Sequence, residues 1–135
     1  EPNFDLHQTV LKNDYNFLNS NDLELMHATI ENRDVSFKGI AELSKKDYSI
    51  EKIGRLLLKH HEILSTRLNV STIKIDRMIE ASMDAGAYGA KITGSGGGGC
   101  MFALTPEDPN PVCEAIRNAG GDAYLVKTDR GTCKS

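Results

Sequence analysis

The sequence lacks any apolar run approaching the ~20 residues that a membrane-spanning helix requires. It also lacks a surplus of basic residues, because 16 Lys and Arg stand against 19 Asp and Glu, for a formal net charge of −3. Binding to nucleic acid or to an anionic membrane depends on clustered positive charge. We therefore expect neither a nucleic acid nor a membrane among the partners of this chain.

Cysteine is scarce, with three residues at positions 100, 113 and 133 and no C-x-x-C pair that could hold zinc. The chain opens with Glu1-Pro2 and has neither the basic nor the apolar region of a secretory leader. An odd number of cysteines in such a chain indicates reduced thiols and a cytoplasmic location. Because the initiator methionine is missing as well, we expect a fragment or a processed chain.

Glycine, by contrast, is abundant in one place: seven of the 12 glycines lie between Gly86 and Gly99. The segment Gly94–Gly99 separates two runs that are typical of β-strands. A run of mobile glycines costs conformational entropy on folding, so a compensating role is expected. Consecutive N–H groups that face one way form an anion-binding concavity, and phosphate is its usual ligand.

This loop does not fit the two best-known phosphate-binding loops. Gly94, Gly96 and Gly99 satisfy G-x-G-x-x-G, but a dinucleotide fingerprint must open a helix directly afterwards. Here a short strand-like run follows and ends at Pro106. A Walker A loop ends in Gly-Lys-Ser/Thr, whereas Lys91 precedes the glycines. A flexible hairpin that binds no ligand stays open as the simpler alternative.

The stretch Lys91-Ile92-Thr93-Gly94-Ser95-Gly96-Gly97-Gly98-Gly99-Cys100 resembles the third conserved motif of the GHMP kinases, and its form is most similar to the mevalonate kinase branch. Ser95 stands where that branch more often has alanine. Upstream, Leu68-Asn69-Val70-Ser71-Thr72 is similar to the Leu-Gly-Val-Ser stretch of the same enzymes, with Asn69 in place of glycine. The resemblance extends from about Ser49 to Thr105.

The resemblance implies the C-terminal lobe of an ATP-dependent kinase that phosphorylates a hydroxyl of a small molecule such as mevalonate, in isoprenoid biosynthesis. It places the loop beside the ATP phosphates and the acceptor, where the partner is the N-terminal lobe of the same enzyme. The implied loop residues are Gly94, Ser95, Gly96, Gly97, Gly98 and Gly99, supported by Lys91 and Thr93. The groups that bind ATP and Mg²⁺ belong mainly to the other lobe, so we expect no catalytic or metal-binding residue here and no activity of the isolated chain.

Alternatives to this function remain open. Another GHMP kinase, acting on phosphomevalonate or on a sugar, would carry a similar loop. A stand-alone ferredoxin-like module that binds a small ligand is an alternative outside the kinases, because fold alone does not define function. We also count a second copy of this chain, in a homodimer, among the candidate partners.

The periodicity of apolar residues predicts the order of the elements. Helices are expected from an N-cap at Asn21, after a bend near Asp34, from Ser49 to Asn69, from Ser71 or Thr72 to Gly86, and from Asn110 to Gly120. Strands are expected on both sides of the loop and at Ala123–Val126. This order predicts an α+β fold: a ferredoxin-like split β-α-β sheet with helices packed on one face and extra N-terminal helices. We expect one domain over residues 1–135, with 1–21 as a poorly determined lead-in and 130–135 as a tail.

Two further expectations concern reactive side chains. We expect His60 or His61 to belong to the apolar stripe of its helix, because adjacent residues point about 100° apart and no third metal ligand is suitably spaced. We expect Cys100 to be a buried, inert thiol at the start of the strand after the loop.

Overall fold

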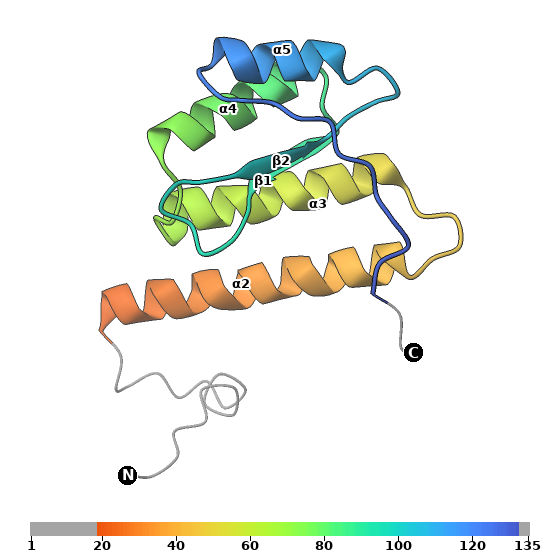
Figure 1. Cartoon of the computed structure of the whole chain (residues 1–135). Helices are drawn as coiled ribbons and strands as arrows, with labels where there is room; N and C mark the ends of the chain where they lie inside the picture. The colour runs from red at the N-terminus through yellow and green to blue at the C-terminus, as the bar shows by residue number, and fades with distance from the viewer. Residues whose placement is uncertain (1–18, 133–135) are drawn as a thin grey trace.

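The computed structural model describes residues 19–132 of the chain. Its elements follow the predicted order of helices, hairpin and helix (Figure 1): α2 (Ser20–Leu43), α3 (Ile50–Glu62), α4 (Ile73–Asp84), β1 (Gly89–Ile92), β2 (Met101–Leu104) and α5 (Asn110–Asn118). The α+β class is confirmed. No helix among residues 19–132 is long and apolar enough to cross a membrane.

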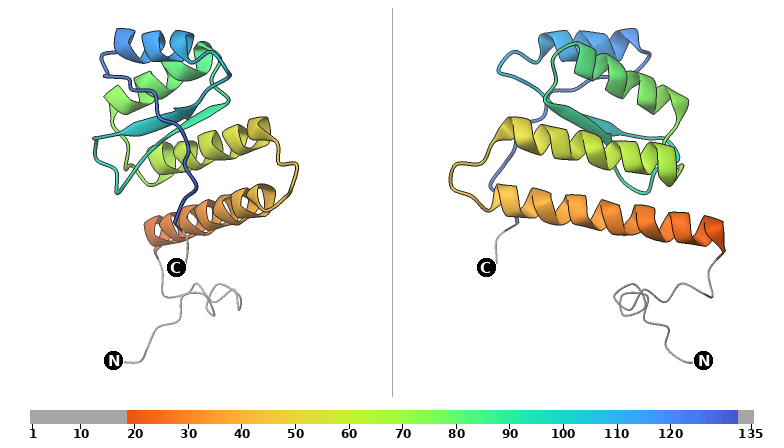
Figure 2. Two further views of the ribbon diagram at one scale, coloured as in Figure 1. Left: turned by 45° about the vertical axis from the view of Figure 1, so that its right-hand side comes forward. Right: turned by 180° about the vertical axis from the view of Figure 1, so that it is seen from behind.

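Helix α2 is one continuous helix, so the predicted bend near Asp34 is wrong. Its N-cap is Asn19, whose side chain accepts a hydrogen bond of 2.9 Å from the N–H of Asp22, and Asn21 already lies inside the helix. Of the predicted lead-in over residues 1–21, residues 1–18 lie outside the described part. Helix α2 packs along α3, on the side of α3 that is remote from the sheet (Figure 2).

Helix α3 begins where it was predicted to begin, because the Ser49 hydroxyl accepts a hydrogen bond from the N–H of Lys52. After Glu62 the chain widens into a π-helical turn at Ile63–Arg67. It then leaves the helical direction at Asn69, whose φ of 53° is left-handed, as predicted for a C-terminal residue of this type.

Helix α4 begins at the predicted cap Thr72, whose hydroxyl accepts a hydrogen bond from the N–H of Ile75. It ends before Gly86, which has a φ of 99°. The buried face is the predicted one and comprises Ile75, Met78, Ile79 and Ser82. Helix α5 likewise ends before a left-handed glycine, Gly120, although its N-cap is Pro109 rather than Asn110.

Strands β1 and β2 form an antiparallel pair in which Ala90 faces Ala103 and Ile92 faces Met101. These four side chains pack with residues of α3, α4 and α5 in the main hydrophobic core, and the backbone of α3 also lies against β1 where Gly54 meets Gly89. Lys91 and Phe102 alternate with the four core side chains and lie on the opposite face. The structure therefore carries the glycine loop at the end of a hairpin that is anchored on a helical layer.

The predicted strand at Ala123–Val126 is absent from the structure. The sheet of the described residues consists of β1 and β2 only. Tyr124 and Val126 are each 83% exposed. A β-strand needs a neighbour with free N–H and C=O groups, and here a groove separates this segment from β2. Figure 1 shows the segment running as an irregular chain across β2 and on toward α2.

Candidate functional site: the glycine loop and its surroundings

The loop over residues 94–99 joins β1 to β2 and depends on glycine for its shape. Five positive φ angles occur within it, at Gly94 (74°), Gly96 (88°), Gly97 (80°), Gly98 (125°) and Gly99 (89°). Side chains other than glycine rarely adopt these values, so the prediction of several left-handed residues is confirmed. The neck of the loop is closed by Thr93, whose N–H and hydroxyl both donate to the Cys100 carbonyl, at 3.0 and 3.1 Å.

The N–H groups of the loop fall into two classes. Gly97 donates a hydrogen bond of 2.7 Å to the carbonyl of Val70, in the segment before α4. The N–H groups of Gly94, Ser95, Gly96, Gly98 and Gly99 donate to no other group among the described residues. The loop thus fixes one of its donors to the protein and keeps several others available for an anion.

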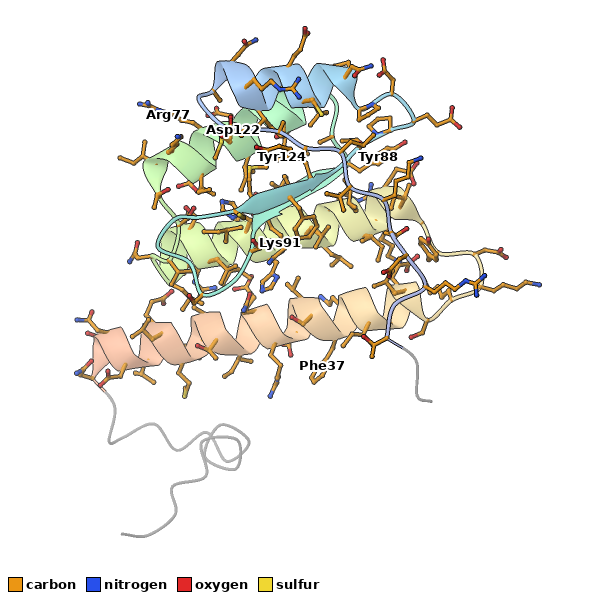
Figure 3. The ribbon with its side chains drawn as sticks, in the orientation of Figure 1. Phe37, Arg77, Tyr88, Lys91, Asp122 and Tyr124 are labelled. Atoms are coloured by element: carbon orange, nitrogen blue, oxygen red, sulfur yellow. The ribbon has the colours of Figure 1, made fainter. Side chains whose placement is uncertain are left out.

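The predicted supporting residues lie at the start of the loop. Lys91, which is labelled in Figure 3, donates a hydrogen bond of 2.7 Å from Nζ to the Ile92 carbonyl, and its ammonium lies 5.8 Å from the centre of the Phe102 ring. Burial of this side chain lowers the pKa of Lys91. The Thr93 hydroxyl donates to the Cys100 carbonyl at the neck of the loop, whereas Ser95 is exposed at the tip. Lys91 therefore braces the exit of β1, and Ser95 offers the free hydroxyl of the loop.

A groove of about 650 Å³ starts at the loop and runs between β2, α4 and α5 on one side and the C-terminal segment on the other. Gly98, Gly99 and Thr72 line the end at the loop, and Tyr124 lies on the C-terminal segment (Figure 3). Most of its wall is apolar, with Lys74 and Asp122 as charged members. The loop therefore opens on one side toward a hollow that is large enough for a ligand or another chain segment.

The structure corrects the expectation for Cys100, which is exposed rather than buried. The physical reason is its position in the neck: β2 begins only at Met101, and the Cys100 carbonyl is fixed by both donors of Thr93. The residue therefore precedes the alternation that turns the partly buried Met101 and Ala103 toward the core. Of the other cysteines, Cys113 is half-buried and Cys133 lies outside the described residues.

A polar cluster below the loop was missed by the sequence reasoning. His61 is 4% exposed, and its Nε2 lies 2.8 Å from Oδ1 of Asp76. Asp76 also accepts hydrogen bonds from the hydroxyls of Ser65 (2.9 Å) and Ser71 (2.7 Å). The N–H of Ile92 donates to Nδ1 of His61 at 3.3 Å. Burial favours the neutral acid of Asp76, but the bonds from Ser71, His61 and Ser65 outweigh it and lower the pKa of this carboxyl.

Part of this cluster could have been found in the sequence. His61 falls on the apolar stripe of α3, as expected, and a polar side chain in a core needs a polar partner. Asp76 occupies the first turn of α4, where a carboxylate is favoured by the helix dipole. The hydrogen bond between His61 and Asp76 could not be predicted from the sequence, because 15 residues and a change of chain direction separate them.

A metal site is not formed by the described residues, among which no group of three or more His, Cys, Asp or Glu side chains could hold an ion. The carboxylate of Asp76 accepts hydrogen bonds from the hydroxyls of Ser65 and Ser71 and from the imidazole of His61. Residues 19–132 therefore form no cage of side-chain ligands around a metal ion.

Comparison with known proteins connects this loop to a family of kinases. The family model described as GHMP kinases C terminal matches residues 38–122. A mevalonate kinase from Pyrococcus furiosus is 40% identical over 109 residues, which cover 80% of this chain and 31% of the relative. A galactokinase from the same organism is 40% identical over 82 residues, which cover 61% of this chain and 22% of the relative.

Among solved structures, the crystal structure of L. major mevalonate kinase in complex with R-mevalonate aligns with a TM-score of 0.47 and 20% sequence identity. The alignment covers 87% of this chain and 34% of that chain. The chain thus spans about a third or less of the length of the relatives it matches.

Proposed function

The chain belongs to the GHMP kinase C-terminal family, and from this premise we propose that it is the C-terminal lobe of an ATP-dependent small-molecule kinase. The observation that carries the proposal is the glycine loop, with five left-handed glycines and five N–H groups that have no partner among the described residues. This arrangement suits a phosphate group, because no Cβ stands between the backbone donors and an approaching anion.

The role we propose for the loop follows from the chemistry of phosphoryl transfer. That reaction depends mostly on positioning the reactants and on neutralising the charge of the transferred group. The free N–H groups and the Ser95 hydroxyl would hold phosphate oxygens of ATP next to the acceptor hydroxyl. Thr93 and Lys91 would keep the neck of the loop in place through the carbonyls of Cys100 and Ile92. ATP is thus the cofactor of the proposed activity.

The remaining parts of the reaction are assigned to an N-terminal lobe. Magnesium would be held there, since residues 19–132 offer no cluster of ligands for it. The exposed Tyr124, Leu125 and Val126, together with the groove beside β2, form an apolar surface that another part of the enzyme would cover. We propose that the other lobe is the partner at this surface, with a second copy of the chain as the alternative. The isolated chain is accordingly expected to be inactive.

For the acceptor we propose mevalonate, and hence a role in isoprenoid biosynthesis, because the loop has the form of the mevalonate kinase branch. Phosphomevalonate and sugars are the alternative acceptors, and a matching relative is named galactokinase. We place the enzyme in the cytoplasm, where the exposed thiol of Cys100 would remain reduced.

The proposal is tested by titrating ATP into the chain with and without Mg²⁺, and by assaying phosphorylation with and without an added N-terminal lobe. We expect weak, largely magnesium-independent binding of ATP by the chain alone. Transfer to mevalonate should appear only when the other lobe is present, with phosphomevalonate and galactose as parallel acceptors. Tight Mg²⁺-ATP binding or turnover by the chain alone would contradict the two-lobe assignment. Activity on galactose but not on mevalonate would move the assignment to a sugar kinase.

A further inference from the structure

We propose that His61 and Asp76 are positioning residues that hold the glycine loop in its binding geometry. Neither residue belongs to the loop. Their hydrogen bonds end instead at the two places where the loop is attached to the rest of the protein. The kinetic consequence of this proposal rests on the proposed kinase function, whereas its structural consequence does not.

The first attachment is the exit of β1. Ile92 is the last residue of this strand and lies two positions before Gly94. Its N–H donates to Nδ1 of His61, so a side chain of α3 fixes the backbone from which the loop departs. Ile92 itself is 1% exposed, so water has little access to this N–H group.

The second attachment lies in the middle of the loop. Gly97 donates to the carbonyl of Val70, and Gly96 approaches Val70 so closely that a Cβ on Gly96 would lie 2.7 Å from the Cβ of Val70. The position of Val70 therefore decides the position of the loop. The next residue, Ser71, donates its hydroxyl proton to Oδ1 of Asp76 at 2.7 Å.

The two attachments are joined by the contact between His61 and Asp76. Because the N–H of Ile92 donates to Nδ1, that nitrogen carries no proton in the neutral ring, and the proton resides on Nε2. Nε2 then donates to the Asp76 carboxylate at 2.8 Å. Asp76 thus selects the tautomer that can accept from Ile92, in the way a carboxylate orients a histidine in other sites.

The arrangement is more specific than a packing role requires. A purely structural pair could link α3 to α4 through any of their facing residues. Here Asp76 collects Ser65, Ser71 and His61 on its two oxygens, and the bonds lead from it to Ile92 and to the segment at Val70. The two ends of the hydrogen-bonded chain therefore lie at Ile92 and Ser71, next to the two places where the loop is attached.

The test uses the 135-residue chain with Asp76→Asn, and Asp84→Asn as a matched control on the same helix, where Asp84 is exposed. The side-chain amide that Asp76→Asn introduces has one accepting oxygen in place of two and no charge, so it cannot accept from His61, Ser65 and Ser71 as the carboxylate does. In ¹⁵N spectra we expect the wild-type chain and the control to carry the His61 proton on Nε2, and Asp76→Asn to show a mixture of both tautomers, because the amide can accept from Nε2 or donate to it.

Hydrogen exchange provides the second measurement. We expect exchange of the Ile92 and Gly97 amides to accelerate roughly tenfold or more in Asp76→Asn, the effect of losing a hydrogen bond to a charged group. The amides of Met78 and Ile79 in α4 should keep their rates. In Ser71→Ala, a milder change, we expect acceleration at Gly97 without acceleration at Ile92. Uniform acceleration of all core amides, or none at Gly97 in either variant, would overturn the positioning role. If Asp76→Asn does not fold, the exchange rates of the Ile92 and Gly97 amides in Ser71→Ala decide whether the positioning role holds.

The kinetic measurement separates this proposal from the one on which it rests. In the enzyme assembled with its other lobe, Asp76→Asn should raise the KM for ATP by about tenfold, with a smaller change in kcat. Altered loop amides with unchanged kinetics would support the positioning role and count against the loop as the ATP site. Unaltered loop amides would overturn the positioning role whatever the kinetics.

Discussion

Two neighbouring glycines of the loop, Gly96 and Gly97, should respond differently to the same substitution by alanine. Their backbones are alike, with φ angles of 88° and 80°. Their surroundings are not, because a Cβ on Gly97 meets no atom within 4 Å, whereas a Cβ on Gly96 would overlap the Val70 carbonyl and lie 2.7 Å from its Cβ. Comparing the two substitutions therefore separates the energetic cost of backbone strain from that of a steric clash with Val70.

For Gly97→Ala, the left-handed conformation costs about 1–2 kcal/mol. The lower entropy of the unfolded chain offsets about 0.4–1 kcal/mol of this, so the net loss of stability should be about 1 kcal/mol. For Gly96→Ala the same strain is joined by overpacking against Val70, which costs about 1–3 kcal/mol. The hydrogen bond from Gly97 to Val70 would also be disturbed, at about 1 kcal/mol. We expect Gly96→Ala to lose about 2–5 kcal/mol in total.

The measurement is urea unfolding of both variants of the chain, followed by circular dichroism, with the free energy of unfolding compared to the unsubstituted protein. Equal losses for the two variants would refute the reasoning, because the loop would then not be seated on Val70. In the assembled enzyme, Gly97→Val should lower turnover by more than its loss of stability accounts for, since its side chain would occupy open space at the proposed phosphate site. Equal losses of turnover and stability would mean that the loop is only structural.

Three further predictions concern other parts of the molecule. Gly39→Ala should stabilise the chain by about 0.5–1 kcal/mol in urea unfolding, because Gly39 lies inside α2 and its Cβ would meet no atom within 4 Å; a loss of stability would contradict the continuous helix. The Lys45 ammonium, the Ser49 N–H and the Lys52 ammonium lower the pKa of Glu42 to about 2 from its ordinary value of 4.5. Stabilisation by this carboxylate is therefore complete above pH 4.5 and is lost as the pH falls toward 2. Glu42→Gln should lower the urea midpoint at pH 7, and the difference should shrink over that window; a difference independent of pH would exclude the ion pairs as its cause. Finally, the exposed Cys100 should react with a thiol reagent in the folded chain faster than the half-buried Cys113, as mapped by mass spectrometry, and slow modification of Cys100 would mean that the neck covers it.

The loop and the helix boundaries around it could be predicted from the sequence because their causes are local. Left-handed residues need glycine or asparagine, so the run Gly94–Gly99 and the end at Asn69 follow from residue type alone. The caps at Ser49 and Thr72 have the same local origin, since a hydroxyl at the first turn meets an N–H group three residues away. The family resemblance rests on these same positions, and the family assignment confirms it.

What only the tertiary structure decided concerns groups far apart in the chain. The bond between His61 and Asp76, the seating of Gly97 on Val70 and the failure of Ala123–Val126 to pair all depend on which segments the packed helices bring together. A strand-like sequence forms a strand only beside a free strand edge, and a buried histidine acquires a role only from the carboxylate that faces it. The sequence by itself determined the loop and its backbone shape; the packing of α3 and α4 decided what holds the loop in place, because those hydrogen bonds join residues that no local pattern relates.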